Sequence, residues 1–205
     1  MINIKAVLFD YDGVMTLDKT GTESICKYIS ENIGLDKNIF EGEYRKYNKD
    51  LLYGKPTSEI WEKLCKNIGK DIPIMVLYDS YKNTPINYEM HELVLKIKNK
   101  NIKTGLITDN KAERIDYIDE VFNLSKYFDI ISVSGKLGFG KESKKVFVKT
   151  LEDLNIEPEE SIFIDNHENN LIIPKEMGIK TIYFNDEKKD MNKLINEIKE
   201  YGIII

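Results

Sequence analysis

Residues 6–14 read AVLFDYDGV, a run of four apolar residues followed by two aspartates and a glycine. A short apolar run without alternating polar residues is typical of a strand that is buried on both faces, as in a parallel sheet. The carboxylates of Asp10 and Asp12 leave the carboxyl end of this strand, where open parallel sheets bind their ligands. Gly13 then allows the chain to turn sharply. This segment therefore predicts a ligand site at a sheet edge.

The two carboxylates point to the same side as long as the chain stays extended. At a separation of about 4 Å they repel each other by roughly 4 kcal/mol at an effective dielectric constant near 20. A cation or a proton must offset that repulsion, and Mg²⁺ prefers oxygen ligands of this kind. The alternative is that Asp10 and Asp12 only form a turn or cap a helix.

Outward from this segment, short aliphatic runs alternate with longer stretches of helical period. Met90, Leu93, Val94 and Ile97 predict one helix that begins after Asn87 as its N-cap, and residues 146–154 predict another. Further strands are predicted at 103–107, 130–133, 161–164 and 180–184. This alternation indicates an α/β fold, a parallel sheet with helices on its faces.

Residues 14–86 break this alternation, because roughly 70 residues of helical pattern separate the first strand from the second. A single crossover needs far fewer. Apolar residues recur at helical spacing over 25–33 and 60–68. We predict a core of residues 1–13 and 87–205 and a helical cap of residues 14–86 that forms a lid. The alternative is extra helices packed on the sheet with no role over the site.

The composition narrows the class of protein. The chain has 205 residues, 41% hydrophobic and 32% charged, which suits one globular domain with a small insert. A net charge of -5 argues against a duplex nucleic-acid binder, and no apolar run is long enough to span a membrane. Cys26 and Cys65 lack the spacing of a zinc site or a disulfide framework. We expect a cytoplasmic protein with reduced thiols and without nucleic-acid or membrane partners.

Three further polar sites follow predicted strands or begin helices. Thr108, with Asp109 and Asn110 after it, offers a hydroxyl and free N–H groups that can hold phosphate oxygens. Lys141 follows two glycines and can neutralise a phosphate, and Asp165 adds a third carboxylate at the same sheet edge. Each has an alternative: Thr108 and Asp165 as helix caps and Lys141 as a surface lysine.

Together, the four sites resemble those of the haloacid dehalogenase-like hydrolase superfamily, in which they lie in this order at the strand ends of a Rossmann-like sheet. The likeness is closest to the subgroup with a helical cap between the first two motifs, which includes sugar-phosphate phosphatases. The matching patterns are strand-Asp-x-Asp-Gly-Val at 6–14, strand-Thr at 108, Gly-x-x-Lys with Phe six residues later at 138–147, and Ile164-Asp165 leading through Asn170 to Gly178.

The resemblance implies a magnesium-dependent phosphatase. Asp10 would attack phosphorus and form an aspartyl-phosphate, while Asp12 would protonate the leaving oxygen and then activate water. Magnesium would be held by Asp10, the Asp12 carbonyl and Asp165. Thr108 and Lys141 would orient the phosphate and offset its charge, and Asp109 and Asn110 are further candidates for substrate binding.

Three positions depart from the family pattern. Asn166 stands where many relatives have a second acid, so we expect it as a further candidate metal ligand and expect weaker magnesium binding. Glu142 stands where relatives often have proline, and Asp109 where they commonly have asparagine. We expect both acids to be turned away from the site. Of the two histidines, we expect His91 on the surface of a helix and His167 at the rim of the site.

The leading interpretation is a hydrolase acting on a small phosphorylated metabolite. A phosphomutase of the same fold and a non-catalytic metabolite-binding protein on the same scaffold remain alternatives, the latter because of Asn166. Dehalogenation is disfavoured, because it does not need the acid–base group that Asp12 supplies. The substrate and the oligomeric state stay open.

Overall fold

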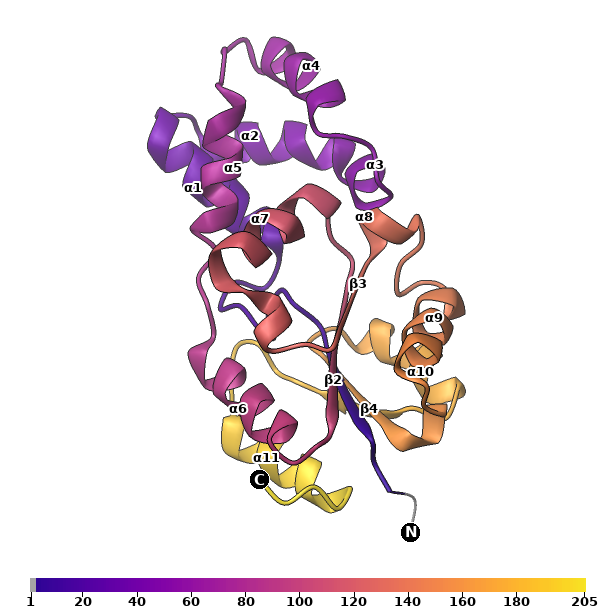
Figure 1. Cartoon of the computed structure of the whole chain (residues 1–205). Coiled ribbons are helices and arrows are strands. Elements are labelled where there is room, and N and C mark those ends of the chain that lie inside the picture. Colours follow the sequence, from indigo (N-terminus) through magenta and orange to yellow (C-terminus); the bar gives the residue numbers. More distant parts are fainter. Residues whose placement is uncertain (1–2) are drawn as a thin grey trace.

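The structure, a computed structural model, describes residues 3–205; Met1 and Ile2 of the predicted core lie outside them. Its centre is a parallel sheet (Figure 1). The sheet has five strands in the order β3-β2-β1-β4-β5. The strands are β1 (Ala6–Phe9), β2 (Lys103–Thr108), β3 (Ile130–Val133), β4 (Ser161–Asp165) and β5 (Lys180–Tyr183). All five predicted strands are present, which confirms the α/β fold with a Rossmann-like parallel sheet.

Helices cover both faces of the sheet, as predicted. Val7 and Phe9 of β1 belong to the hydrophobic cluster on one face, and Ala6 and Leu8 belong to the cluster on the other. This alternation follows from the two-residue period of a strand. The helices of the first cluster are α6 (Tyr88–Lys98), α7 (Ala112–Phe122) and α11 (Met191–Glu200); those of the second are α9 (Lys144–Leu154) and α10 (Ile172–Glu176).

The structure confirms the predicted N-cap residue of α6 and its predicted row of buried apolar residues. Asn87 accepts a hydrogen bond from the Met90 N–H, and Met90, Leu93, Val94 and Ile97 are buried. Short helices complete the core: η2 (Leu124–Lys126), α8 (Ser134–Leu137), η3 (Pro158–Glu160) and η4 (Glu168–Leu171). Among residues 3–205, no helix is both long enough and apolar enough to cross a lipid bilayer.

The chain between β1 and α6 is helical and lies above the carboxyl ends of the strands (Figure 1). It has its own hydrophobic cluster, which contains Trp61 and the unpaired, buried Cys26 and Cys65. We call this segment the helical cap; its boundaries as a domain stay a prediction. Its helices are α1 (Gly21–Ile33), α2 (Lys37–Tyr44), η1 (Arg45–Tyr47), α3 (Asn48–Leu52), α4 (Ser58–Ile68) and α5 (Ile74–Lys82).

Two linkers join the cap to the core, and they pair with each other. Thr16 and Ile86 form an antiparallel bridge. The Leu17 N–H donates to the Pro85 carbonyl at 2.9 Å, and the Asn87 N–H donates to the Met15 carbonyl at 3.0 Å. The chain therefore enters and leaves the cap through one hydrogen-bonded hinge.

The prediction that His91 lies on the surface is wrong. Its side chain is buried, and its ring packs edge-on against Tyr127 with the ring centroids 4.7 Å apart. The helical pattern marks Met90 and Val94 as buried but does not show that Tyr127, more than 30 residues later, covers the adjacent position. Burial lowers the pKa of His91 from 6.5 to about 4.

This burial predicts acid sensitivity. Between pH 6.5 and about pH 4, the unfolded chain binds a proton at His91 that the folded chain does not bind. The free energy of unfolding therefore falls as pH is lowered through this window, by up to about 3 kcal/mol, and is unaffected by His91 above it. In urea titrations near neutral pH and near pH 5, His91→Leu is expected to lose less stability than the wild type. An unchanged loss in the variant would contradict this assignment.

Candidate functional site

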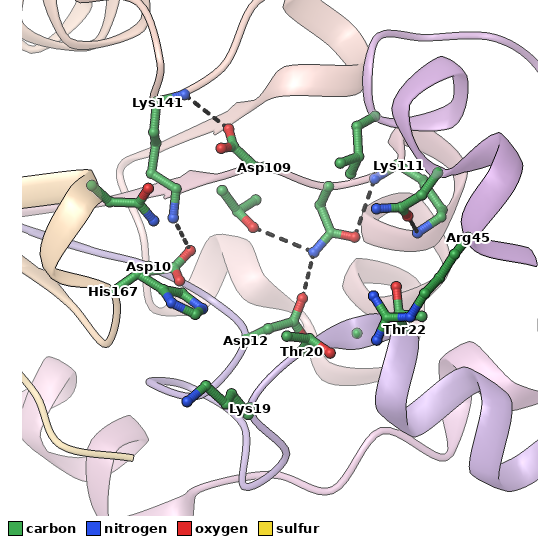
Figure 2. Close-up of a pocket in the computed structure, with 16 residues that line it drawn as sticks. Asp10, Asp12, Lys19, Thr20, Thr22, Arg45, Asp109, Lys111, Lys141 and His167 are labelled. Atoms are coloured by element: carbon green, nitrogen blue, oxygen red, sulfur yellow. Dashed lines mark hydrogen bonds and ion pairs between the residues drawn. The ribbon is translucent and has the colours of Figure 1, made fainter. Parts of the chain in front are cut away.

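A pocket of about 220 Å³ lies between the carboxyl ends of the strands and the helical cap (Figure 2). Asp10 directly follows β1, and Asp165 ends β4. These strands are neighbours in register, with Phe9 opposite Ile164, and the Asp10 N–H donates to the Ile164 carbonyl at 2.9 Å. Sheet pairing therefore places the two aspartates side by side, although 155 residues separate them in the chain.

Lys141 joins these two carboxylates. Its Nζ lies 2.7 Å from Asp10 Oδ1 and 2.7 Å from Asp165 Oδ2, and all three side chains are buried. Burial alone would lower the pKa of Lys141, but the negative charges of Asp10 and Asp165 outweigh it and raise this pKa. The structure thus places Lys141 beside Asp10 and Asp165 in the interior, and the alternative of a surface lysine is wrong.

The charges of Asp10, Asp165 and Lys141 do not balance. Asp10 and Asp165 carry two negative charges when ionised, and Lys141 supplies one positive charge. Burial raises the pKa of Asp10 well above its ordinary value, against the opposing effect of the Lys141 ammonium. A further cation would favour the ionised form of Asp10 that a nucleophile requires.

Oxygen atoms converge next to Asp10. The side-chain amide nitrogen of Asn166 donates to the Asp12 carbonyl oxygen at 3.1 Å and to Asp10 Oδ2 at 3.3 Å. Gly13, at φ +81°, makes this approach possible, because a Cβ there would lie 2.2 Å from an atom of the Asn166 amide.

These atoms fit a magnesium ion. Across residues 3–205, no group of three or more His, Cys, Asp or Glu side chains is placed to hold a metal ion. The Asp12 carboxylate turns towards Arg114 and does not join Asp10 and Asp165 as a third side chain. Two carboxylates and a backbone carbonyl are nevertheless oxygen ligands of the kind that Mg²⁺ takes, usually with several waters. Asp10, Asp165 and the Asp12 carbonyl would therefore hold it; Asn166 would join them only with its amide oxygen, in place of the nitrogen, turned towards the ion.

Asp165 is held in place on all sides. Its Oδ1 accepts a hydrogen bond from the His167 N–H at 2.7 Å, and Asn170 Nδ2 lies 3.1 Å from Oδ2. His167 lines the pocket, as predicted. No helix begins at Asp165, so the alternative role as a helix cap is replaced by contacts within the site.

The Asp12 carboxylate has partners of its own. Arg114 Nη1 and Nη2 donate to Oδ2 and Oδ1, each at 2.8 Å, and Asn110 Nδ2 donates to Oδ2 at 2.8 Å. Arg114 is fully buried. The negative charge of Asp12 is thus matched by a guanidinium, separately from the Lys141 cluster.

Thr108 and the next two residues, Asp109 and Asn110, all line the pocket. Thr108 caps no helix, because α7 begins only at Ala112, and its hydroxyl accepts a hydrogen bond from Asn110 Nδ2 at 3.3 Å. The expectation that Asp109 is turned away from the site is wrong, because Asp109 lines the pocket. Its Oδ1 accepts a hydrogen bond from the Lys141 backbone N–H at 2.9 Å, and burial raises its pKa. Glu142 instead accepts a hydrogen bond from the Gly140 N–H and does not line the pocket.

The cap supplies the opposite wall. Arg45, Asn48 and Leu52 line the pocket, so the cap helices reach the site instead of only packing on the sheet. Lys111, from the core, is buried beneath them, with its Nζ 3.3 Å from Asn48 Oδ1 and 5.2 Å from the centre of the Tyr44 ring. Burial, and then the nearby Arg114, lower the pKa of Lys111 to about 7.

Sequence reasoning missed several pocket residues. One signal for Arg114 was available: it lies four residues before Ile118 and next to Ile115, on the apolar stripe of α7, where a charged residue requires a buried partner. Lys19, Arg45 and Lys111 carry no such signal. Their places depend on how the cap lies over the core, which no local pattern encodes.

The chain is similar to several known proteins. The bifunctional epoxide hydrolase 2 of Sus scrofa is 24% identical over 93% of this chain, which spans only 38% of that relative. The phosphoglycolate phosphatase of Aquifex aeolicus is 25% identical over 87% of this chain and 83% of its own. The crystal structure of a HAD family enzyme from Bacteroides thetaiotaomicron, an Asp-to-Ala mutant in complex with magnesium and inorganic phosphate, has a TM-score of 0.76 at 21% identity, covering 94% of this chain and 99% of that one.

The structural likeness, at this identity, shows the common fold. A sequence family described as haloacid dehalogenase-like hydrolase matches residues 7–184, from β1 to just beyond β5. The match includes Asp10, Thr108 and Asp165 at three strand ends, Lys141 in the loop after α8, and the helical cap between Asp10 and Thr108. The chain belongs to the haloacid dehalogenase-like hydrolases.

Proposed function

We propose that this hydrolase is a magnesium-dependent phosphatase that removes the phosphoryl group from a small metabolite through an aspartyl-phosphate on Asp10. The observation that supports it best is the buried cluster in which Lys141 bridges Asp10 and Asp165 at 2.7 Å each. Several relatives are named phosphatases, among them the Aquifex aeolicus protein and the phosphorylated carbohydrates phosphatase of Thermotoga maritima.

The reaction has two steps. In the first, an oxygen of Asp10 bonds to phosphorus, the bond to the leaving oxygen breaks, and that oxygen takes a proton from Asp12. In the second, water attacks phosphorus, gives its proton to Asp12, and Asp10 is released. Bound magnesium supplies positive charge to the phosphoryl oxygens and to Asp10. Lys141, the Thr108 hydroxyl and Asn110 orient the phosphoryl group.

The remainder of the pocket favours an anionic leaving group. Apart from Lys141, three cationic side chains line it: Lys19, Arg45 and Lys111. One phosphoryl group at the Lys141 end does not require charges on the cap side. A metabolite with a second acidic group, a carboxylate or a second phosphate, would place that group near Lys111 and Arg45. We extend the proposal to such substrates, acting in the cytoplasm without nucleic-acid or membrane partners.

Replacing the nucleophile tests the proposed reaction. Asp10→Asn is expected to lose at least about 1,000-fold in kcat towards an aryl phosphate with Mg²⁺, because an amide cannot form the acyl phosphate. Asp153→Asn, the same change at an exposed residue paired with Lys149, is the matched control and should retain wild-type activity. A wild type that is inactive across a broad phosphate panel would contradict the proposed function and favour a metabolite-binding protein.

Replacing Lys111 tests whether the pocket selects substrates with a second anionic group. Lys111→Met is expected to raise KM about tenfold for a substrate with a second anionic group, the loss of roughly one ion pair, and to leave KM for a plain aryl phosphate within about twofold. Lys111 loses its proton above about pH 7. The wild-type KM for the substrate with a second anionic group should therefore rise as the pH increases through this value. Equal effects on both substrates in steady-state kinetics would refute this role.

A further inference from the structure

Arg114 is one of only two arginines among the 30 basic residues of the chain, and it is fully buried. Its guanidinium donates through Nη1 and Nη2 to both oxygens of the Asp12 carboxylate. A planar fork of this kind fixes the orientation of a carboxylate, whereas a lysine ammonium offers only a point charge. The Arg114 fork thus holds one face of the carboxylate that the proposed function uses as its acid–base group.

The hydrogen bonds leave few free positions on Asp12. An ionised carboxylate accepts about four hydrogen bonds, roughly two at each oxygen. Oδ2 accepts from Arg114 Nη1 and from Asn110 Nδ2, so both of its positions are taken. Oδ1 accepts only from Arg114 Nη2. The atom with room for a proton is therefore Oδ1.

Arg114 also contacts the cap at its first helix and next to the returning linker. Its Nη2 lies 3.3 Å from Thr84 Oγ1, just before the returning linker, and it packs against Gly21 at the start of α1. A Cβ on Gly21 would lie 2.4 Å from Nη1 and 2.9 Å from Asp12 Oδ2. The guanidinium is thus enclosed where the hinge of the cap meets Asp12.

We propose that Arg114 is a positioning residue for catalysis, which orients Asp12 so that Oδ1 faces the reacting oxygen, and that the cap hinge holds this fork in place. The inference rests on the proposed function. A purely structural ion pair would not need a carboxylate that lines the pocket, and the Asp12 side chain is 14% exposed there while Arg114 is 0% exposed.

The test uses two leaving groups. An aryl phosphate releases a weakly basic phenolate that needs no proton, whereas an alkyl phosphate needs one from Asp12. In single-turnover rapid-quench experiments, Arg114→Lys is expected to slow formation of the phospho-enzyme about 100-fold for an alkyl phosphate and less than about threefold for the aryl phosphate. Loss of structural integrity alone would slow both substrates alike.

Gly21→Ala provides a second variant that keeps Arg114 and displaces its fork, since the new methyl group would overlap Nη1. It is expected to show the same selective loss for the alkyl phosphate, so the test does not depend on Arg114→Lys being folded. Equal losses for both substrates, or no loss for either, would overturn the role of Arg114. A wild type that forms no phospho-enzyme with either substrate would overturn the proposed function, and this inference with it.

Discussion

The pairing of two buried carboxylates with one ammonium is the constraint on which the rest of the site depends. Asp10 and Asp165 lie side by side because β1 and β4 are neighbours in register, and Lys141 bridges them. A buried charge without a partner is costly, so a further cation would stabilise this cluster. The Asp12 carbonyl, which the Asn166 amide links to Asp10 by hydrogen bonds, would offer that cation a further oxygen ligand.

Two aspartates that are only two residues apart have separate partners. Asp10 shares Lys141 with Asp165, whereas Asp12 is held by Arg114 and Asn110. Carboxylates in different surroundings can take different roles, one as a nucleophile and the other as an acid and base. The turn at Gly13 and the start of the cap bring about this separation, because they direct the Asp12 side chain towards α7 and away from the Lys141 cluster.

The sheet and its ligand-bearing strand ends were predictable from the sequence, because both depend on local patterns. Short apolar runs marked all five strands, and polar residues directly after them marked Asp10, Thr108 and Asp165. Lys141 could be predicted only from the ordered set of motifs, because a lysine near two glycines carries little information alone. The burial of His91 and the places of Lys111 and Arg114 were missed, because each depends on contacts with a distant segment: Tyr127, the cap, or Asp12.

The central claim is that a divalent cation completes the charge balance of the Asp10 cluster. The most direct test is a crystal structure of the protein grown with Mn²⁺, whose anomalous scattering locates the ion independently of any assignment of water. The account predicts one ordered ion in contact with Asp10, Asp165 and the Asp12 carbonyl. Crystals in which Mn²⁺ is ordered only elsewhere, or is absent at saturating concentration while Lys141 still bridges the two aspartates, would contradict it.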